Sequence, residues 1–192
     1  MLRGPCAFGK DDYASFVPSS LSFRRATQAD AALVVDLVQR GYRGDDSRAG
    51  WTTEADLLDG QRTDLEEVHG IIGDTQAAIL LGFEAELLVA CLAMAFRPAG
   101  AAYFGMIAVD PARQGEGYGR ALLAEAERRA LLEGNAVRAR MTVIAQRSEL
   151  IAWYGRRGYL ATGERERFPY GNPRFGLPRR PDLYFEVLEK VL

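Results

Sequence analysis

Short apolar runs that end at turn signals predict the strands in the first half of this chain. Residues 21–25 alternate apolar and polar positions, as a half-buried strand does. Two longer runs, residues 77–83 and 87–96, flank a short acidic segment and predict an antiparallel hairpin. Residues 101–109 form a third run, which we expect to end at Asp110-Pro111.

Helical spacing predicts three helices among these strands. Thr27 and Asp30 are candidate caps for a helix that ends near Gly41. Apolar residues over 122–131 recur at helical spacing beside charged ones, and Gly134-Asn135 provides the stop. A third, short helix is expected over residues 149–156.

The second half of the chain alternates strands with helices. We expect strands over residues 138–145, 159–162 and 183–191. Between the last two, residues 164–182 contain too many prolines for a regular element. Hairpins followed by alternating elements predict a mixed α/β sheet.

Two stretches show no such periodicity. Residues 1–19 mix Gly, Pro, Ser and charge, so we expect a flexible N-terminal extension before one domain over residues 20–192. Residues 42–64 are polar and rich in turns, and Thr52 or Thr53 followed by Glu54 predicts a helix start there. We expect this segment to meet a substrate.

Composition narrows the class of protein. A length of 192 residues leaves room for one domain with a real core. With 24 basic and 26 acidic side chains, the overall field predicts neither nucleic acid nor a membrane as partner. The apolar runs are shorter than a membrane span or signal peptide needs, so we expect a cytoplasmic protein. Of the two cysteines, Cys91 lies in an apolar run and is expected in the core.

The most informative stretch is a strand that leads through Gln114-Gly115-Glu116-Gly117-Tyr118-Gly119-Arg120 into a helix. The first turn of a helix carries unpaired N–H groups, and glycines let a phosphate approach them closely. The dinucleotide pattern G-x-G-x-x-G fails because Arg120 stands at its last glycine. The P-loop fails because no Gly-Lys-Ser or Gly-Lys-Thr occurs.

The spacing of Gln114, Gly117 and Gly119 resembles the Gln/Arg-x-x-Gly-x-Gly turn of the GCN5-related N-acetyltransferase (GNAT) superfamily. Residues 152–159 are similar to that family's tyrosine helix, which is followed by Gly-Tyr or Gly-Phe. The resemblance covers residues 21–192. It implies a mostly antiparallel sheet of six or seven strands, flanked by about four helices.

The resemblance implies that acetyl-CoA is the co-substrate, with its pyrophosphate on the glycine turn and its pantetheine arm along the preceding strand. Many relatives carry asparagine near the start of the tyrosine helix, whereas this chain has Arg147 there, which either replaces that contact or leaves it absent. The residues expected to bind the coenzyme are Met106, Ile107, Ala108, Val109, Gln114, Gly115, Glu116, Gly117, Tyr118, Gly119, Arg120 and Arg147.

The implied reaction is acetyl transfer to a primary amine by direct attack on the thioester. Tyr154 falls on the family's tyrosine position and is the expected acid for the departing thiolate, with a core aromatic as the alternative. Glu54 is the first candidate for the base, and a helix-start carboxylate is its alternative; Glu84, Glu86 and His69 are further candidates. No metal is implied, because the thioester supplies the activation.

Two aromatic residues are candidates for the acceptor side. Trp51 lies beside Glu54, where an aromatic wall and a carboxylate could receive a cationic amine. Tyr170 lies in the long segment 164–182, which we expect to be a lid, a subunit contact or surface cover. The acceptor is a small-molecule or peptide amine.

Two other functions stay open at this point. One is a non-catalytic module that senses acyl-CoA, and the other is a dinucleotide enzyme, which Arg120 disfavours. A homodimer is also considered, because the alternating strand over residues 183–191 could pair at a sheet edge.

Overall fold

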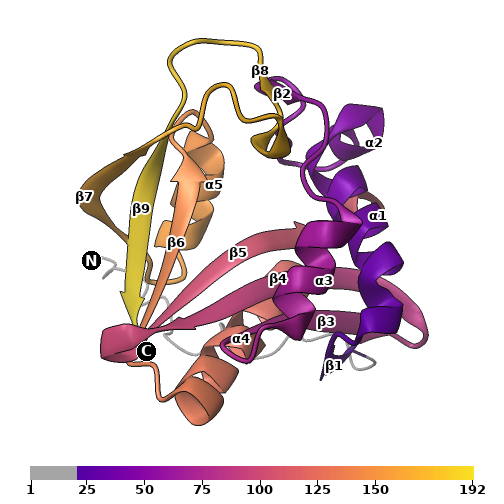
Figure 1. The fold of residues 1–192 in the computed structure, drawn as a ribbon, viewed down its shortest axis with the longest axis vertical. Helices are drawn as coiled ribbons and strands as arrows, with labels where there is room; N and C mark the ends of the chain where they lie inside the picture. The colour runs from indigo at the N-terminus through magenta and orange to yellow at the C-terminus, as the bar shows by residue number, and fades with distance from the viewer. Residues whose placement is uncertain (1–20) are drawn as a thin grey trace, which may run out of the picture.

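The computed structural model describes residues 21–192, so the extension expected over residues 1–19 lies outside the described part of the chain. Its main sheet has seven strands in the order β1-β3-β4-β5-β6-β9-β7, and all its pairs are antiparallel except β5–β6 (Figure 1). The strands are β1 (Leu21–Arg25), β3 (Ala77–Glu84), β4 (Leu87–Arg97), β5 (Ala101–Val109), β6 (Arg138–Ile144), β7 (Leu160–Arg167) and β9 (Tyr184–Val191). The described chain has five α-helices: α1 (Ala31–Tyr42), α2 (Gly44–Arg48), α3 (Leu65–Gly73), α4 (Tyr118–Gly134) and α5 (Ser148–Gly155).

Helices cover both faces of this sheet. α1 and α3 pack on one face, where Val34, Leu37 and Val68 are buried against strand side chains. α4 and α5 belong to the core on the other face, in which Leu122 and Tyr154 are buried. The central strands β3 and β4 are therefore almost uninterrupted runs of apolar residues, which is typical of strands buried on both faces.

Most predicted elements are confirmed, two predictions about local structure are wrong and one helix was missed. The segment 164–182 is also more regular than expected, because β7 continues to Arg167 and β8 lies within it. The helix start expected at Thr52 or Thr53 is absent; the short helix α2 lies earlier, and the Thr53 hydroxyl accepts the N–H of Ala55 in a turn. α3 was not predicted. β9 lies between β6 and β7, so the strand expected at a sheet edge has no free edge for pairing with a second copy.

The sheet splits where the pairing of β5 with β6, its only parallel pair, ends. β5 and β6 are registered over three residue pairs, from Ala101–Arg138 to Tyr103–Arg140, and then diverge, which gives the V shape of Figure 1. A β-bulge in the β4–β5 ladder lies at the same place, and Met106 takes a left-handed conformation with φ of 51°. Bulges bend the strand that carries them. The bulge therefore turns the end of β5 away from β6 and opens a wedge.

A second, two-stranded sheet crosses the open end of this wedge. β2 (Leu58–Asp59) pairs with β8 (Leu177–Pro178), which lies in the segment 164–182. We call this pair the clasp. The side chain of Arg179 holds both carboxylate oxygens of Asp59 at 2.8 and 2.6 Å. The clasp joins the first half of the chain to the last across the wedge (Figure 1).

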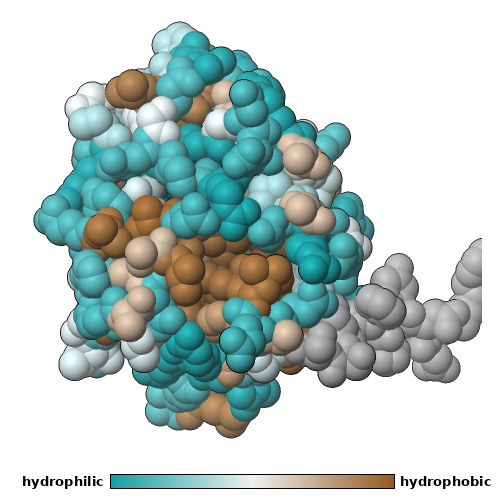
Figure 2. All heavy atoms as spheres, turned by 90° about the vertical axis from the view of Figure 1, so that its right-hand side faces the viewer, coloured by the Kyte–Doolittle hydropathy of each residue, from teal (hydrophilic) through white to brown (hydrophobic). Residues whose placement is uncertain are grey.

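The surface turned toward the viewer in Figure 2 carries an apolar patch at its centre, within a hydrophilic surround. Within residues 21–192, no helix is long and apolar enough to cross a membrane.

Candidate active site

The glycine turn between β5 and α4 has the geometry of an anion site. Gly115 and Gly117 both have φ of 90°, a conformation that side chains other than glycine rarely adopt. Gly117 caps α4, and the first N–H bonded within this helix is that of Ala121, to the Gly117 carbonyl. The N–H groups of Tyr118 and Gly119 precede that bond and face the turn. No Cβ built at Gly115 would meet a described atom within 4 Å, so the turn has room for a ligand.

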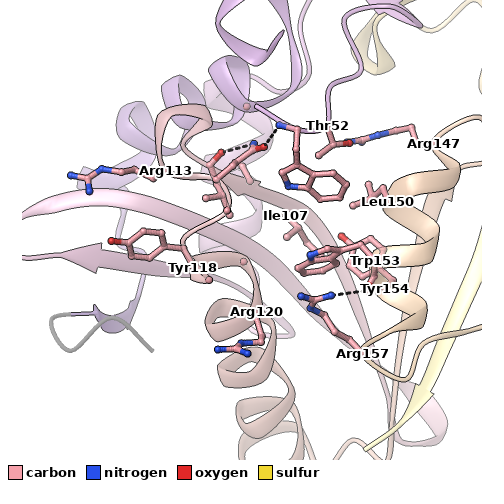
Figure 3. A pocket seen from close by; sticks show the side chains of 18 of the residues that line it. Thr52, Ile107, Arg113, Tyr118, Arg120, Arg147, Leu150, Trp153, Tyr154 and Arg157 are labelled. Carbon is pink, nitrogen blue, oxygen red and sulfur yellow. Dashed lines mark hydrogen bonds between the residues drawn. The ribbon is translucent and has the colours of Figure 1, made fainter. Parts of the chain in front are cut away.

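Arginines gather around this turn. Arg157 of the loop after α5 lies against the turn with Arg120, and Arg113 and Arg156 line the same cavity. The guanidinium of Arg157 stacks 3.4 Å from the centre of the Trp153 ring (Figure 3). Burial, followed by the positive charges of Arg156 and Arg120, lowers the pKa of Arg157 to about 10. A bound anion would relieve this crowding of positive charge, so the residues present fit a polyphosphate.

Gln114 connects the turn to the segment after α1. Its amide nitrogen donates to the Val109 carbonyl, and its amide oxygen accepts the N–H of Trp51 at 3.0 Å. A Cβ on Gly50 would lie 2.4 Å from that oxygen, so a side chain there would displace the Gln114 amide from this contact. The Trp51 ring is consequently placed 6.4 Å from that of Trp153, between centroids.

These groups surround a cavity of 420 Å³, which we call the turn cavity (Figure 3). Its lining comes from the end of α1, from Trp51 and Thr52, from β5, from the glycine turn and from α5. Tyr118 lines it but donates its hydroxyl to Glu84, away from the aromatic pair.

The end of β5 presents backbone groups to the wedge. Ala108 pairs with Cys91 of β4, and the Asp110 N–H bonds to Val89. Because neighbouring residues of a strand direct their backbone groups to opposite edges, those of Ile107 and Val109 face the wedge. Their carbonyls are held by the Tyr42 hydroxyl at 2.8 Å and by Gln114 at 3.3 Å.

A second cavity of 210 Å³ lies inside the wedge, between β5 and β6, and we call it the wedge cavity. Leu58 of the clasp and Phe175 just before β8 help to close it. The two cavities meet at residues that line both of them: Tyr42, Ile107, Arg147, Leu150 and Tyr154. A group that passes between ligands in the two cavities would pass here.

Tyr154 is buried at this junction, with 4% of its surface exposed. Its ring packs edge-on against Trp153 and Tyr159, at centroid distances of 5.0 and 5.9 Å. Its hydroxyl forms no hydrogen bond with the residues that the structure describes. Burial, followed by the nearby Tyr42, raises the pKa of Tyr154, so the phenol is protonated at neutral pH.

Glu54 lies in the wall of the wedge cavity, but both of its oxygens are engaged. Arg43 donates to one at 2.5 Å and Arg147 to the other at 2.7 Å. Burial opposes ionisation, yet the charges of Arg147, Arg43 and Arg62 outweigh it and hold the pKa of Glu54 below its usual value. A carboxylate held in this way is a weak base at neutral pH.

The structure places the other expected site residues on different walls of the site, and one of them outside it. Trp51, which was expected on the acceptor side, lines the turn cavity and not the wedge cavity. Arg147 lies between the two cavities and binds Glu54 and Thr52. Tyr170 lines neither cavity; its hydroxyl donates to the Arg180 carbonyl and accepts the Leu183 N–H, which orders its own loop. Met106 is buried and lines the wedge cavity, and Glu116 lines the mouth of the turn.

Cys91 lies in the core, as its place in an apolar run predicts. It is fully buried, and burial raises its pKa to about 12, so it is not a thiolate at neutral pH. In residues 21–192, no group of three or more His, Cys, Asp and Glu side chains is arranged to hold a metal ion.

Comparison with known proteins identifies the family. The sequence profile of the Acetyltransferase (GNAT) family matches residues 40–159, which include β5, the glycine turn, α4 and Tyr154. The chain belongs to the GNAT family. No curated protein matches it in sequence.

Solved structures share the GNAT fold at low sequence identity. The ribosomal-protein-S18-alanine N-acetyltransferase from Escherichia coli superposes with a TM-score of 0.66 at 16% identity, over 89% of this chain and 93% of that one. The spermidine N-acetyltransferase from Vibrio cholerae, in complex with CoA and spermine, gives 0.65 at 15% identity, over 90% and 96%. The PaiA N-acetyltransferase from Thermoplasma acidophilum, in complex with coenzyme A, gives 0.63 at 16% identity, over 90% and 99%.

Proposed function

We propose that this GNAT protein transfers the acetyl group of acetyl-CoA to a primary amine, with the coenzyme in the turn cavity and the amine in the wedge cavity. The observation that carries the proposal is the junction of the two cavities at Tyr154 and the open edge of β5. The family membership and the coenzyme A held by two structural neighbours support it.

In this proposal the glycine turn binds the pyrophosphate through the N–H groups of Tyr118 and Gly119 at the start of α4, and Arg157 adds charge at the mouth. The pantetheine arm lies along the wedge edge of β5. The N–H groups of Ile107 and Val109 are then the donors available to the thioester carbonyl and to the arm, because the neighbouring carbonyls are already bonded.

The amine nitrogen attacks the thioester carbon, the new C–N bond forms and the C–S bond breaks. Tyr154 donates its proton to the departing sulfur, and the phenolate regains a proton from the acetylated nitrogen through solvent, so the products are an amide and free CoA. We assign Glu54 the positioning of Arg43 and Arg147, in place of the base role that the sequence suggested.

The test is calorimetric titration with acetyl-CoA followed by thiol release with amines. Gly117→Glu should abolish binding, because it places bulk and negative charge at the pyrophosphate. Gly163→Glu is the matched control: it also has positive φ, 83°, and a Cβ there would meet no described atom within 4 Å, but it lies on β7. Absence of binding to the wild type would refute the proposal. Binding without thiol release for any amine would favour the acyl-CoA sensor instead.

A further inference from the structure

The wedge cavity is rich in arginine. Arg43, Arg62 and Arg147 all line it, against the carboxylates of Glu54 and Glu166. Glu166 is exposed on β7. Glu54 is shared between two of the arginines, so the interior wall carries more positive than negative charge.

These arginines keep unused donors. Arg43 has 4% of its surface exposed, and its Nε and one of its terminal nitrogens are buried without a hydrogen-bond partner in the described chain. The Nε of Arg147 is in the same state. Burying an unpartnered charged donor is costly, so the described wall has fewer hydrogen-bond acceptors than its arginines can use.

Arg62 is the arginine that forms no hydrogen bond with Glu54, although the charges of Glu54 and Glu67 both act on it. Its guanidinium lies 5.2 Å from the ring centre of Tyr42, whose other neighbour is Arg147 at 5.7 Å. Within residues 21–192 it forms neither an ion pair nor a side-chain hydrogen bond. Tyr42 lines both cavities, so Arg62 contacts a side chain at the junction of the two cavities.

We infer that the acceptor is a small amine that also carries an anionic group, a carboxylate or a phosphate, and that Arg62 binds this group. The inference rests on the proposed function. Guanidinium groups match the geometry of both anions and form strong charge-assisted hydrogen bonds with them. A polyamine would bring only positive charge to a wall that is already positive. The volume of 210 Å³, half that of the turn cavity, suits an acceptor of about amino-acid size.

The experiment compares matched acceptors in a thiol-release assay with the full chain and saturating acetyl-CoA. The pairs are free amino acids against their amides and 2-aminoethyl phosphate against 2-aminoethanol, with spermidine as the cationic acceptor. We expect kcat/KM for the anionic member of at least one pair to exceed that of its neutral partner by tenfold or more. The pair that responds distinguishes a carboxylate from a phosphate.

Arg62→Gln should erase this preference by lowering kcat/KM for the anionic acceptor about tenfold or more, while the neutral partner changes little. Arg62→Lys, which keeps the charge, should retain part of the preference. Arg165→Gln is the control, because Arg165 pairs with Glu186 at 3.1 Å on the exposed strand β7 and lines neither cavity. It should behave as the wild type.

Equal or better rates with spermidine or neutral amines would overturn the inference, as would equal losses of both pair members in Arg62→Gln. If no acceptor turns over, the thermal midpoint of unfolding is measured with CoA bound. N-acetylglycine should raise this midpoint and N-acetylglycinamide should not. Equal shifts with the two compounds would overturn the inference. Calorimetry with acetyl-CoA distinguishes a failure of the proposed function from a failure of this inference. Failure to bind it refutes the proposed function, whereas binding with a cationic preference refutes this inference alone.

Discussion

The buried pairs of Glu54 give a sharp test of the arrangement between the two cavities. Glu54→Gln removes the negative charge that Arg43 and Arg147 share, at 6% exposure, and leaves their guanidinium groups uncompensated. Breaking a buried ion pair from one side costs about 3–5 kcal/mol. With a urea m-value of about 2 kcal/mol/M for a domain of this size, the unfolding midpoint should fall by about 2 M.

Asp59→Asn is the matched control, since it makes the same carboxylate-to-amide change beside an arginine. The side chains of Asp59 and Arg179 are 52% and 49% exposed. Water screens an exposed pair and leaves it little net stabilisation, so the midpoint of Asp59→Asn should fall far less than that of Glu54→Gln. Equal shifts in the two variants would refute the reasoning that burial makes the Glu54 pairs critical.

The dependence on pH follows from the lowered pKa of Glu54. A carboxyl whose pKa is lower in the folded state stabilises the fold above its unfolded pKa, and this stabilisation is lost as pH falls through the folded pKa. The difference between wild type and Glu54→Gln should therefore be complete at neutral pH and should close below the ordinary value of 4.5. If the difference in stability between the two proteins stays constant down to acid pH, the lowered pKa of Glu54 is not its cause.

Three further predictions concern the turn cavity and its junction. Tyr154→Phe should lower kcat by about 10²-fold or more, because it removes the acid, while calorimetry should show unchanged acetyl-CoA affinity. Arg157→Met should raise the KM for acetyl-CoA about tenfold with little change in kcat, since it removes a contact made equally before and during transfer; steady-state kinetics would show a kcat loss if the residue acted otherwise. Trp51 and Trp153 are the only tryptophans of the chain, so acetyl-CoA should change its tryptophan emission, and the change should shrink in Trp51→Phe.

Local signals in the sequence predicted the elements that local chemistry determines. Asp110-Pro111 ends β5 and the glycines of residues 115–119 begin α4, because backbone conformation there depends on a few neighbouring residues. The helix start predicted at Thr53 was wrong, because a threonine hydroxyl accepts a backbone N–H in a turn as readily as at a helix N-terminus. Asp64 caps α3 and carried a similar signal, which was overlooked.

The candidate site was only partly predictable, because much of it joins distant segments. Glu54 and Arg147 are 93 positions apart, and no periodicity in the chain relates them. The family resemblance placed Tyr154 and the glycine turn, whereas the arginine lining of the wedge and the stacked Arg157 depend on how the sheet splits. The position of β9 inside the sheet is likewise a matter of long-range pairing.

The clasp turns the open wedge into a closed ring of backbone, with the wedge cavity inside it. Each strand of the clasp contributes two residues, and Leu177 is 56% exposed, whereas β3 and β4 pair along most of their length. Elements with few buried contacts open at a small fraction of the free energy of global unfolding. Under the proposed function, the acetylated product would leave when the ring parts at Leu58 and Leu177, while the seven-stranded sheet stays intact.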